Sequence, residues 1–264
     1  MPTIKSKTAK IISVTNQKGG VGKTTTTINL AAALSELEKK VLIIDLDPQG
    51  NASTGLGVEV EDRELSTYEF LVEGVPLEKI AMETEISGLS IVPATIDLSS
   101  ADIDLISNEK RSYLLHEALR KKQENKQKYD YILIDCPPSL NILTVNAMVA
   151  SHSVLIPLQS EFFALEGLSQ LLLTVKEVRQ TANENLRVEG IVLTMFDGRN
   201  NLSKQVEADA RSNLRELVFK TIIPRNVRVS EAPSYSMPVL TYDPSSKGSK
   251  AYMSLAKELL ANNS

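Results

Sequence analysis

The sequence predicts an α/β fold, in which one domain holds a mainly parallel, twisted sheet with helices on both faces. Three observations predict it. Short apolar runs alternate with amphipathic segments along the 264 residues, which is typical of βαβ units. The runs at residues 41–44 and 131–134 are apolar throughout, as in central strands covered on both faces. A glycine-rich turn at residues 16–24 joins the first apolar run to a helical pattern.

The predicted elements follow one another along the whole chain. Strands are predicted at residues 10–15, 41–45, 89–93, 131–135, 153–157, 189–195 and 218–223. Helices are predicted at 24–38, in a long segment after Phe162 and Phe163, at 202–217 and at 250–260. The polar run 121–128 is interpreted as a solvated helix end or loop. No linker divides the sequence, so we expect one domain over residues 1–264, with a flexible N-terminus at 1–9.

Composition excludes several classes of protein. One cysteine, Cys136, excludes an internal disulfide or a cysteine-only metal site, and two histidines (His116 and His152) argue against zinc. No apolar run approaches the ~20 residues that span a membrane. The basic N-terminus has no apolar core after it, so we expect a cytoplasmic protein. Because the net charge is −4, any nucleic-acid binding must come from a local basic patch.

The glycine-rich turn predicts a phosphate-binding loop. A strand, a turn and a helix start in that order direct backbone N–H groups and partial positive charge toward an anion. Lys23 can then reach the outer phosphates, and the Thr24 hydroxyl can bind Mg²⁺. The sequence departs from the usual P-loop pattern G-x-x-x-x-G-K-[ST] at the first glycine, where Gln17 stands. A second lysine, Lys18, follows Gln17. An ordinary turn with two solvated lysines is the alternative, which the flanking strand and helix disfavour.

Two further stretches, 45–51 and 135–139, begin where apolar strands end. Open α/β sheets bind ligands at the carboxyl ends of their strands. Asp135 is in place to bind Mg²⁺ through water. Asp47 lies further beyond the sheet and is preferred for positioning the attacking water, while Asp45 is a candidate for supporting the metal through water. The alternative for each aspartate is turn or helix-capping chemistry.

These motifs together resemble the ParA/MinD family of deviant Walker A ATPases, a branch of the SIMIBI class of P-loop NTPases. The resemblance is carried by residues 18–25, 45–51, 135–139, 161–167 and 223–234, and it extends from residue 10 to about 260. The short chromosomal ParA type, often called Soj, is the nearest likeness.

The resemblance implies an ATP-dependent switch that forms a sandwich dimer, in which Lys18 reaches across to the partner's phosphates. It implies Lys23 on the β- and γ-phosphates, Thr24 on Mg²⁺ and Asp47 on the attacking water. The implied adenine pocket comes from Pro224, Arg225 and Asn226, and the phosphate loop comprises Gln17, Lys18, Gly19, Gly20, Val21, Gly22, Lys23, Thr24 and Thr25. Hydrolysis would be slow until a ParB/Spo0J-type protein stimulates it, in chromosome or plasmid segregation on the nucleoid.

A basic patch predicts where DNA binds. Residues 199–228 hold seven basic and three acidic side chains. On a helix over 202–217, Leu202, Val206, Ala210, Leu214 and Leu217 share one face, and Lys204, Arg211 and Arg215 share the opposite one. Lys220 adds to the patch, and the resemblance gives Arg199 and Arg228 the greatest weight. We expect contact with double-stranded DNA that does not depend on base sequence. An ordinary solvated face is the alternative.

The other functional classes fit the sequence less well. A MinD-like, membrane-associated ATPase would use its C-terminal helix at the bilayer surface. The apolar face of 250–260 (Tyr252, Leu255, Ala256 and Leu259) has no basic or aromatic extension after it, so we expect it to dock on the domain. An electron carrier of the same superfamily needs more than one cysteine, and a tyrosine autokinase needs a tyrosine cluster. A binding module with an unused nucleotide site stays open, although every catalytic position is filled.

Overall fold

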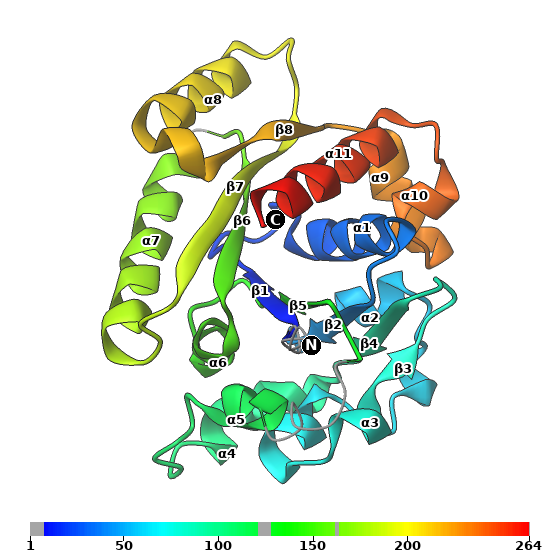
Figure 1. The fold of residues 1–264 in the computed structure, drawn as a ribbon, viewed down its shortest axis with the longest axis vertical. Coiled ribbons are helices and arrows are strands. Elements are labelled where there is room, and N and C mark those ends of the chain that lie inside the picture. The colour runs from blue at the N-terminus through cyan, green and yellow to red at the C-terminus, as the bar shows by residue number, and fades with distance from the viewer. Residues whose placement is uncertain (1–7, 121–127, 162–163, 264) are drawn as a thin grey trace, which may run out of the picture.

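An eight-stranded sheet in the order β3-β4-β2-β5-β1-β6-β7-β8 forms the centre of the molecule (Figure 1). The computed structural model describes residues 8–120, 128–161 and 164–263. All strand pairs are parallel except β3 with β4. The strands are β1 Lys10–Val14, β2 Val41–Asp45, β3 Met82–Glu83, β4 Leu89–Val92, β5 Tyr131–Asp135, β6 Ser153–Gln159, β7 Arg187–Phe196 and β8 Val218–Pro224.

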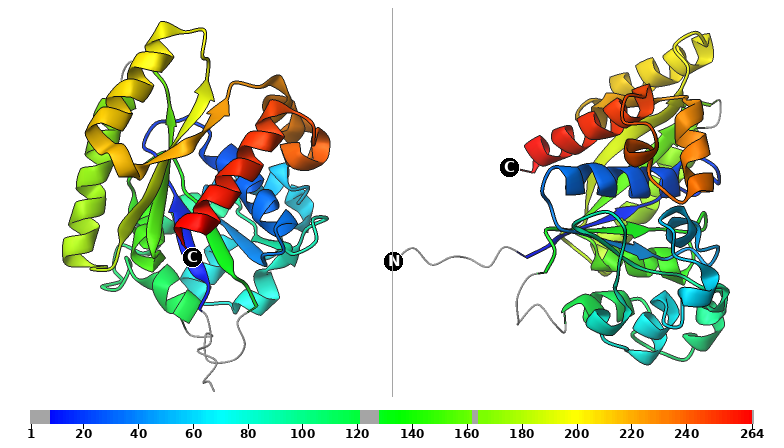
Figure 2. Two further views of the ribbon diagram at one scale, coloured as in Figure 1. Left: turned by 45° about the horizontal axis from the view of Figure 1, so that its top comes forward. Right: turned by 90° about the vertical axis from the view of Figure 1, so that its right-hand side faces the viewer.

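Helices cover both faces of this sheet. The views of Figures 1 and 2 show α1 and α11 side by side on one face, and α5, α6 and α7 on the other. The described helices are α1 Lys23–Glu36, α2 Asn51–Gly55, α3 Leu77–Ile80, α4 Ala101–Asp104, α5 Leu114–Arg120, α6 Ile142–Ala150, α7 Ala164–Thr181, α8 Asn201–Leu214, α9 Val227–Glu231, α10 Val239–Tyr242 and α11 Lys247–Asn262.

The central strands explain why the sheet needs two helical layers. Side chains of a strand alternate between faces, and both sets are apolar here. Ile12 and Ile43 pack in the core shared with α1 and α11, while Ile11 and Ile44 pack in the core shared with α5 and α6. All four are at most 4% exposed. This arrangement confirms the predicted α/β fold and brings the carboxyl ends of β1, β2 and β5 together at one edge.

All seven predicted strands are present, with ends that differ by a few residues. The antiparallel β3 was not predicted, because two residues are too short for a periodic signal. The helix predicted over 202–217 ends at Leu214, and residues 215–217 form a 3₁₀ turn before the chain enters β8. Leu202 is also not in the core. The predicted flexible segment 1–9 and loop 121–128 lie mostly outside the described residues.

The C-terminal helix α11 docks on the domain, as predicted. Tyr252, Leu255, Ala256 and Leu259 are buried in the core that also contains α1. An apolar face that already packs against the protein is not available to a bilayer. No helix among residues 8–120, 128–161 and 164–263 is long and apolar enough to cross a membrane.

Candidate functional site

The phosphate-loop segment lies between β1 and α1, and contacts from two other strands hold it. The Asn16 side chain donates to the Pro157 carbonyl of β6 (2.8 Å) and accepts from the Lys18 N–H (3.0 Å). The Thr194 hydroxyl of β7 donates to the Val21 carbonyl (2.8 Å). The loop is therefore fixed at both ends by strands distant in sequence, and a preformed loop loses little entropy when it binds a ligand.

The start of α1 is open to an anion. Gly20 and Gly22 have φ of 72° and 87°, in the left-handed region that favours glycine. No side chain caps this helix and its first turn contains no acidic residue. The first N–H groups of a helix lack intrahelical partners and carry partial positive charge. An anionic ligand at this position would satisfy them.

Lys23 lies in the interior of the site. It is 6% exposed, and its ammonium group donates to the Lys18 carbonyl (3.1 Å). Burial lowers the pKa of Lys23, and the nearby Asp135, Cys136 and Asp47 oppose that shift. A largely desolvated lysine without a direct carboxylate partner among the described residues gains strongly from a phosphate.

Asp135 ends β5 and is completely buried. Its Oδ1 accepts from the Thr27 hydroxyl (3.0 Å), while Oδ2 has no hydrogen-bond partner among the described residues. Burial, followed by the carboxylate of Asp45, raises the pKa of Asp135. Thr27, which bonds this carboxylate, lies one turn of α1 after Thr24. Mg²⁺ prefers oxygen ligands, and the Thr24 hydroxyl and the unpartnered Oδ2 of Asp135 are of this kind, so the residues present fit this ion.

Replacing the Asp135 carboxylate should raise the stability of the nucleotide-free protein and weaken its Mg²⁺ binding. Because the folded pKa of Asp135 is raised, the unfolded chain loses its proton first, and stability falls as pH rises from about 5 to about 8. The nucleotide-free Asp135→Asn protein should therefore melt roughly 2–5 °C above wild type at pH about 8. The difference in melting temperature should be smaller at pH about 5. Titration calorimetry with and without Mg²⁺ should show the variant losing the metal-dependent gain in ATP affinity. A wild-type protein that melts above the variant at the higher pH contradicts this account.

Asp45 and Asp47 have different surroundings. Oδ2 of Asp45 accepts from the N–H (2.9 Å) and hydroxyl (2.7 Å) of Ser53, so this buried carboxylate holds the start of α2. Its Oδ1 accepts from the Asp47 N–H (3.3 Å), so both oxygens of Asp45 have partners within the chain, which favours the turn and capping alternative for this residue. Asp47 is 7% exposed, lines the cavity and accepts from the Gln49 N–H (3.0 Å) through one oxygen. Of the two, only Asp47 is in place to contact a water beside a bound phosphate.

A cavity of about 580 Å³ joins these groups to the segment after β8. Its lining includes ten predicted residues: Gly19, Gly20, Gly22, Lys23, Thr24, Thr25, Asp47, Pro224, Arg225 and Asn226. Gln17, Lys18, Val21, Asp45 and Asp135 do not line it. Asn226 also caps α9, with its side-chain oxygen accepting from the Arg228 N–H (2.9 Å). A phosphate-binding end and a separate pocket in one cavity suit a nucleotide.

The Lys18 side chain does not line this cavity. Its ammonium group pairs with the Glu161 carboxylate, and the two side chains are 43% and 45% exposed. An exposed ion pair of this kind contributes about 0–1 kcal/mol, so a stronger anion can replace Glu161. The segment 161–167 thus contributes Glu161 here, while Phe162 and Phe163 lie outside the described residues.

Some residues of the site were missed by sequence reasoning. Asn16 was within the predicted turn but not among the predicted site residues, and its side chain holds the loop by bonding Pro157 and Lys18. Thr194 and Met195 come from the end of β7, and Met195 has a φ of 49°, uncommon for a residue other than glycine. Nothing in the local sequence around Thr194 indicates a contact with a loop more than 170 residues earlier.

The basic residues predicted to bind DNA differ in how free they are. Lys204, Arg215 and Lys220 are exposed. Arg211 is half-buried and pairs with Glu207 (2.9 Å), so it does not belong to a free stripe. The Arg199 side chain is 91% exposed and pairs with Asp197, and it lowers the pKa of that carboxyl to about 2. Arg228 pairs with Glu231 and Asp243.

Comparisons with known proteins agree with this site. A family model described as an AAA domain matches residues 9–188. The sporulation initiation inhibitor protein Soj of Bacillus subtilis is 52% identical over 253 residues, which cover 96% of this chain and 99% of that protein. The chromosome-partitioning ATPase Soj of Thermus thermophilus is 48% identical over 250 residues, with 95% of each chain covered.

A solved structure shows what such a site holds in a relative. Cobyrinic acid a,c-diamide synthase from Mycobacterium smegmatis, crystallised with ADP and magnesium, matches with a TM-score of 0.82 and 36% identity. The match covers 96% of this chain and 94% of that one. The identities to Soj proteins, the extent of the matches and the phosphate-loop geometry give one conclusion: the chain belongs to the ParA/Soj family of chromosome-partitioning ATPases.

Proposed function

We propose that this ATPase is a dimerising switch, which pairs when it binds ATP and then binds double-stranded DNA without reading its sequence. One observation carries the proposal. A single chain supplies a nearly complete nucleotide site, yet its Lys18 lies outside the cavity that holds the other phosphate-binding groups. A lysine that bound the phosphates of its own chain would line the cavity, so the geometry favours action on a second copy.

The nucleotide site is assembled from the residues already described. The loop N–H groups and Lys23 bind the β- and γ-phosphates, while Thr24 and, through water, Asp135 hold Mg²⁺. Bound there, Mg²⁺ supplies positive charge that neutralises the phosphate oxygens. Asp47 accepts a hydrogen bond from the attacking water and orients it. The segment from Pro224 to Asn226 closes the cavity around the base.

Lys18 completes the site only across a dimer. The triphosphate of a partner carries more negative charge than one carboxylate, so Lys18 exchanges Glu161 for those phosphates when two copies meet face to face. This dependence on the triphosphate makes pairing sensitive to hydrolysis. A lysine supplied in trans then stabilises the charge of the transferred phosphoryl group, as an arginine finger does.

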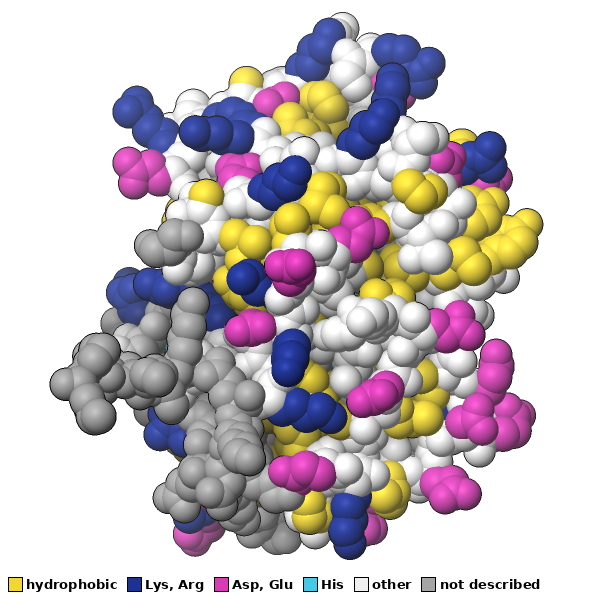
Figure 3. Space-filling view, turned by 45° about the vertical axis from the view of Figure 1, so that its right-hand side comes forward, with side chains coloured by type: hydrophobic (Ala, Val, Ile, Leu, Met, Phe, Trp, Pro, Cys, Tyr) yellow, Lys and Arg dark blue, Asp and Glu magenta, His cyan; other side chains and the backbone are white. Residues whose placement is uncertain are grey.

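DNA would bind at the end of the molecule that carries α8 and β8. Figure 3 shows Lys and Arg side chains most densely on the upper part of one face, and acidic side chains along its lower right edge. Arg199, Lys204, Arg215 and Lys220 are exposed on this end. Pairing doubles the number of phosphate contacts, which strengthens binding steeply at low salt. A ParB/Spo0J-type protein would stimulate hydrolysis and release the DNA, in a cytoplasmic, nucleoid-associated cycle.

Replacement of Arg199 should reveal a phosphate contact. Arg199→Ala should weaken ATP-dependent binding to a mixed-sequence duplex and reduce the slope of log K against log salt by about 1 per copy. The matched control is Arg187→Ala, because Arg187 is an exposed arginine at the first residue of β7, whereas Arg199 follows the other end of that strand. Fluorescence anisotropy at several salt concentrations measures both variants. Equal slopes for the two variants would remove Arg199 from the interface.

Binding to DNA should also exceed binding to membranes. The ATP-bound protein should co-sediment with DNA and not with anionic liposomes, because the apolar face of α11 is buried. Co-sedimentation with liposomes alone would favour the MinD-like alternative.

A further inference from the structure

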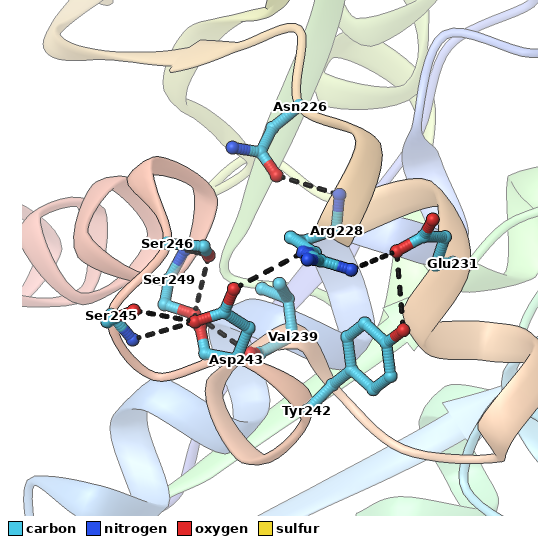
Figure 4. A network of polar contacts seen from close by, with 9 residues as sticks. All are labelled: Asn226, Arg228, Glu231, Val239, Tyr242, Asp243, Ser245, Ser246 and Ser249. Carbon is cyan, nitrogen blue, oxygen red and sulfur yellow. Dashed lines mark hydrogen bonds and ion pairs between the residues drawn. The ribbon is translucent and has the colours of Figure 1, made fainter.

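The short helix α9 lines the nucleotide cavity and also carries an exposed arginine at the molecular surface. Its residues Val229 and Ser230 line the nucleotide cavity. Arg228, on the same helix, has a side chain that is 52% exposed. Figure 4 shows the Arg228 guanidinium between two carboxylates, away from Asn226. A movement of the cavity wall therefore also moves Arg228.

Two carboxylates from different segments hold this arginine. Glu231 of α9 accepts from Nη1 (2.9 Å), and Asp243, which follows α10, lies 3.4 Å from Nε. Both carboxylates are themselves fixed, Glu231 by the Tyr242 hydroxyl (3.3 Å) and Asp243 by the N–H (3.1 Å) and hydroxyl (2.8 Å) of Ser245. One positive charge thus faces two negative ones, so this place repels a phosphate as long as the network is closed.

The two ion pairs differ in what they join. Arg228 and Glu231 lie on one helix and move together. Asp243 belongs to the segment that leads into α11, where the Ser249 hydroxyl donates to the Asp243 carbonyl (2.6 Å). The contact between Arg228 and Asp243 is therefore the one that a shift of α9 breaks.

We infer that Glu231 and Asp243 mask Arg228 from DNA, and that α9 shifts when nucleotide fills the cavity and separates Arg228 from Asp243, which opens the mask on that side. This inference rests on the proposed function. Asn226 caps α9 and lines the cavity, so contact with a nucleotide acts on the first turn of the helix that carries Arg228. Coupling between two sites is reciprocal, so DNA must strengthen nucleotide binding by the same factor.

Isosteric variants test the mask. Asp243→Asn and Glu231→Gln keep the shape of each side chain and remove its charge. Anisotropy with a mixed-sequence duplex is measured without nucleotide and with a non-hydrolysable ATP analogue. In the nucleotide-free state Asp243→Asn should bind DNA about 5–10-fold more tightly than wild type, while affinity with the analogue changes less. Light scattering should show the nucleotide-free variant still monomeric, which excludes pairing as the cause.

The matched control is Asp197→Asn. It frees Arg199, an exposed arginine that pairs with Asp197 two residues earlier and does not lie on α9, so it should strengthen DNA binding by the same factor in both nucleotide states. A double variant, Arg228→Ala with Asp243→Asn, should lose the gain of Asp243→Asn alone.

The outcomes separate the inference from the proposed function. If wild type binds DNA with the analogue and Asp243→Asn raises both affinities equally, or neither, the mask is wrong and the proposed function stands. If wild type binds no DNA in either state, both are overturned. Nucleotide affinity measured with and without DNA is an independent check. The factor by which DNA strengthens nucleotide binding should be smaller in Asp243→Asn than in wild type.

Discussion

Lys18→Ala should bind ATP almost as well as wild type and yet stay monomeric. The side chain contacts Glu161 and does not line the cavity, so its removal should change ATP affinity by less than tenfold, or about 1.4 kcal/mol. The ATP-dependent dimer loses the charge that each copy supplies to the other, and DNA binding and hydrolysis should fall with it. Size-exclusion light scattering with an ATP analogue measures the pairing, and calorimetry measures the affinity.

Two further variants separate this result from general damage to the loop. Lys23→Ala removes the buried lysine of the same loop and should abolish ATP binding itself. Glu161→Gln removes the partner of Lys18 in its own chain and should leave the ATP-dependent dimer intact. A Lys18→Ala protein that dimerises with ATP would show that the lysine does not act across the interface.

Asp47→Ala should trap the paired state. Its carboxylate lines the cavity without a basic partner among the described residues, whereas the groups proposed to hold phosphate and metal lie on α1 and β5. The variant should therefore bind ATP, dimerise and retain DNA, while hydrolysis falls by about 10²–10⁴-fold, the range that a positioned proton acceptor contributes. Single-turnover phosphate release measures the chemical step.

The comparison with Asp135→Asn makes this assignment specific. Loss of Asp135 should weaken Mg²⁺-dependent ATP binding, whereas loss of Asp47 should leave binding and slow turnover. Normal turnover in Asp47→Ala would move the water-positioning role to another group of the cavity, for which Gln49 and Asn51 are the nearest candidates in the chain.

Local features of the site could be predicted because they depend on neighbours in the chain. Gly20 and Gly22 provide left-handed turns, Lys23 begins the helix, and Asp135 ends an apolar strand. Each role depends on a few consecutive residues. The same reasoning was less accurate for α8, where amphipathic spacing extends to Leu217 but the helix ends at Leu214, because the chain has to turn into β8.

Partnerships over long distances could not be predicted in this way. Asp45 and Asp47 are two residues apart and look equivalent in the sequence. In the structure Asp45 accepts hydrogen bonds from Ser53, whereas Asp47 lines the cavity. Arg211 is a different case, because its partner Glu207 lies four residues earlier on the same helix, and the predicted basic stripe did not take that local pair into account. Thr194 supports the phosphate loop from β7, with no local pattern to mark it.

By itself, then, the sequence determined the α/β fold, the phosphate loop, the aspartate that ends β5 and the family, because short-range spacing sets the backbone conformation and the strand ends. Only the tertiary structure decided which charges are free to act. It placed Lys18 against Glu161, 143 residues away, and Arg228 against Asp243 of the segment after α10. Such pairings depend on how the sheet brings distant segments together, and an ion pair leaves no periodic signal in a sequence.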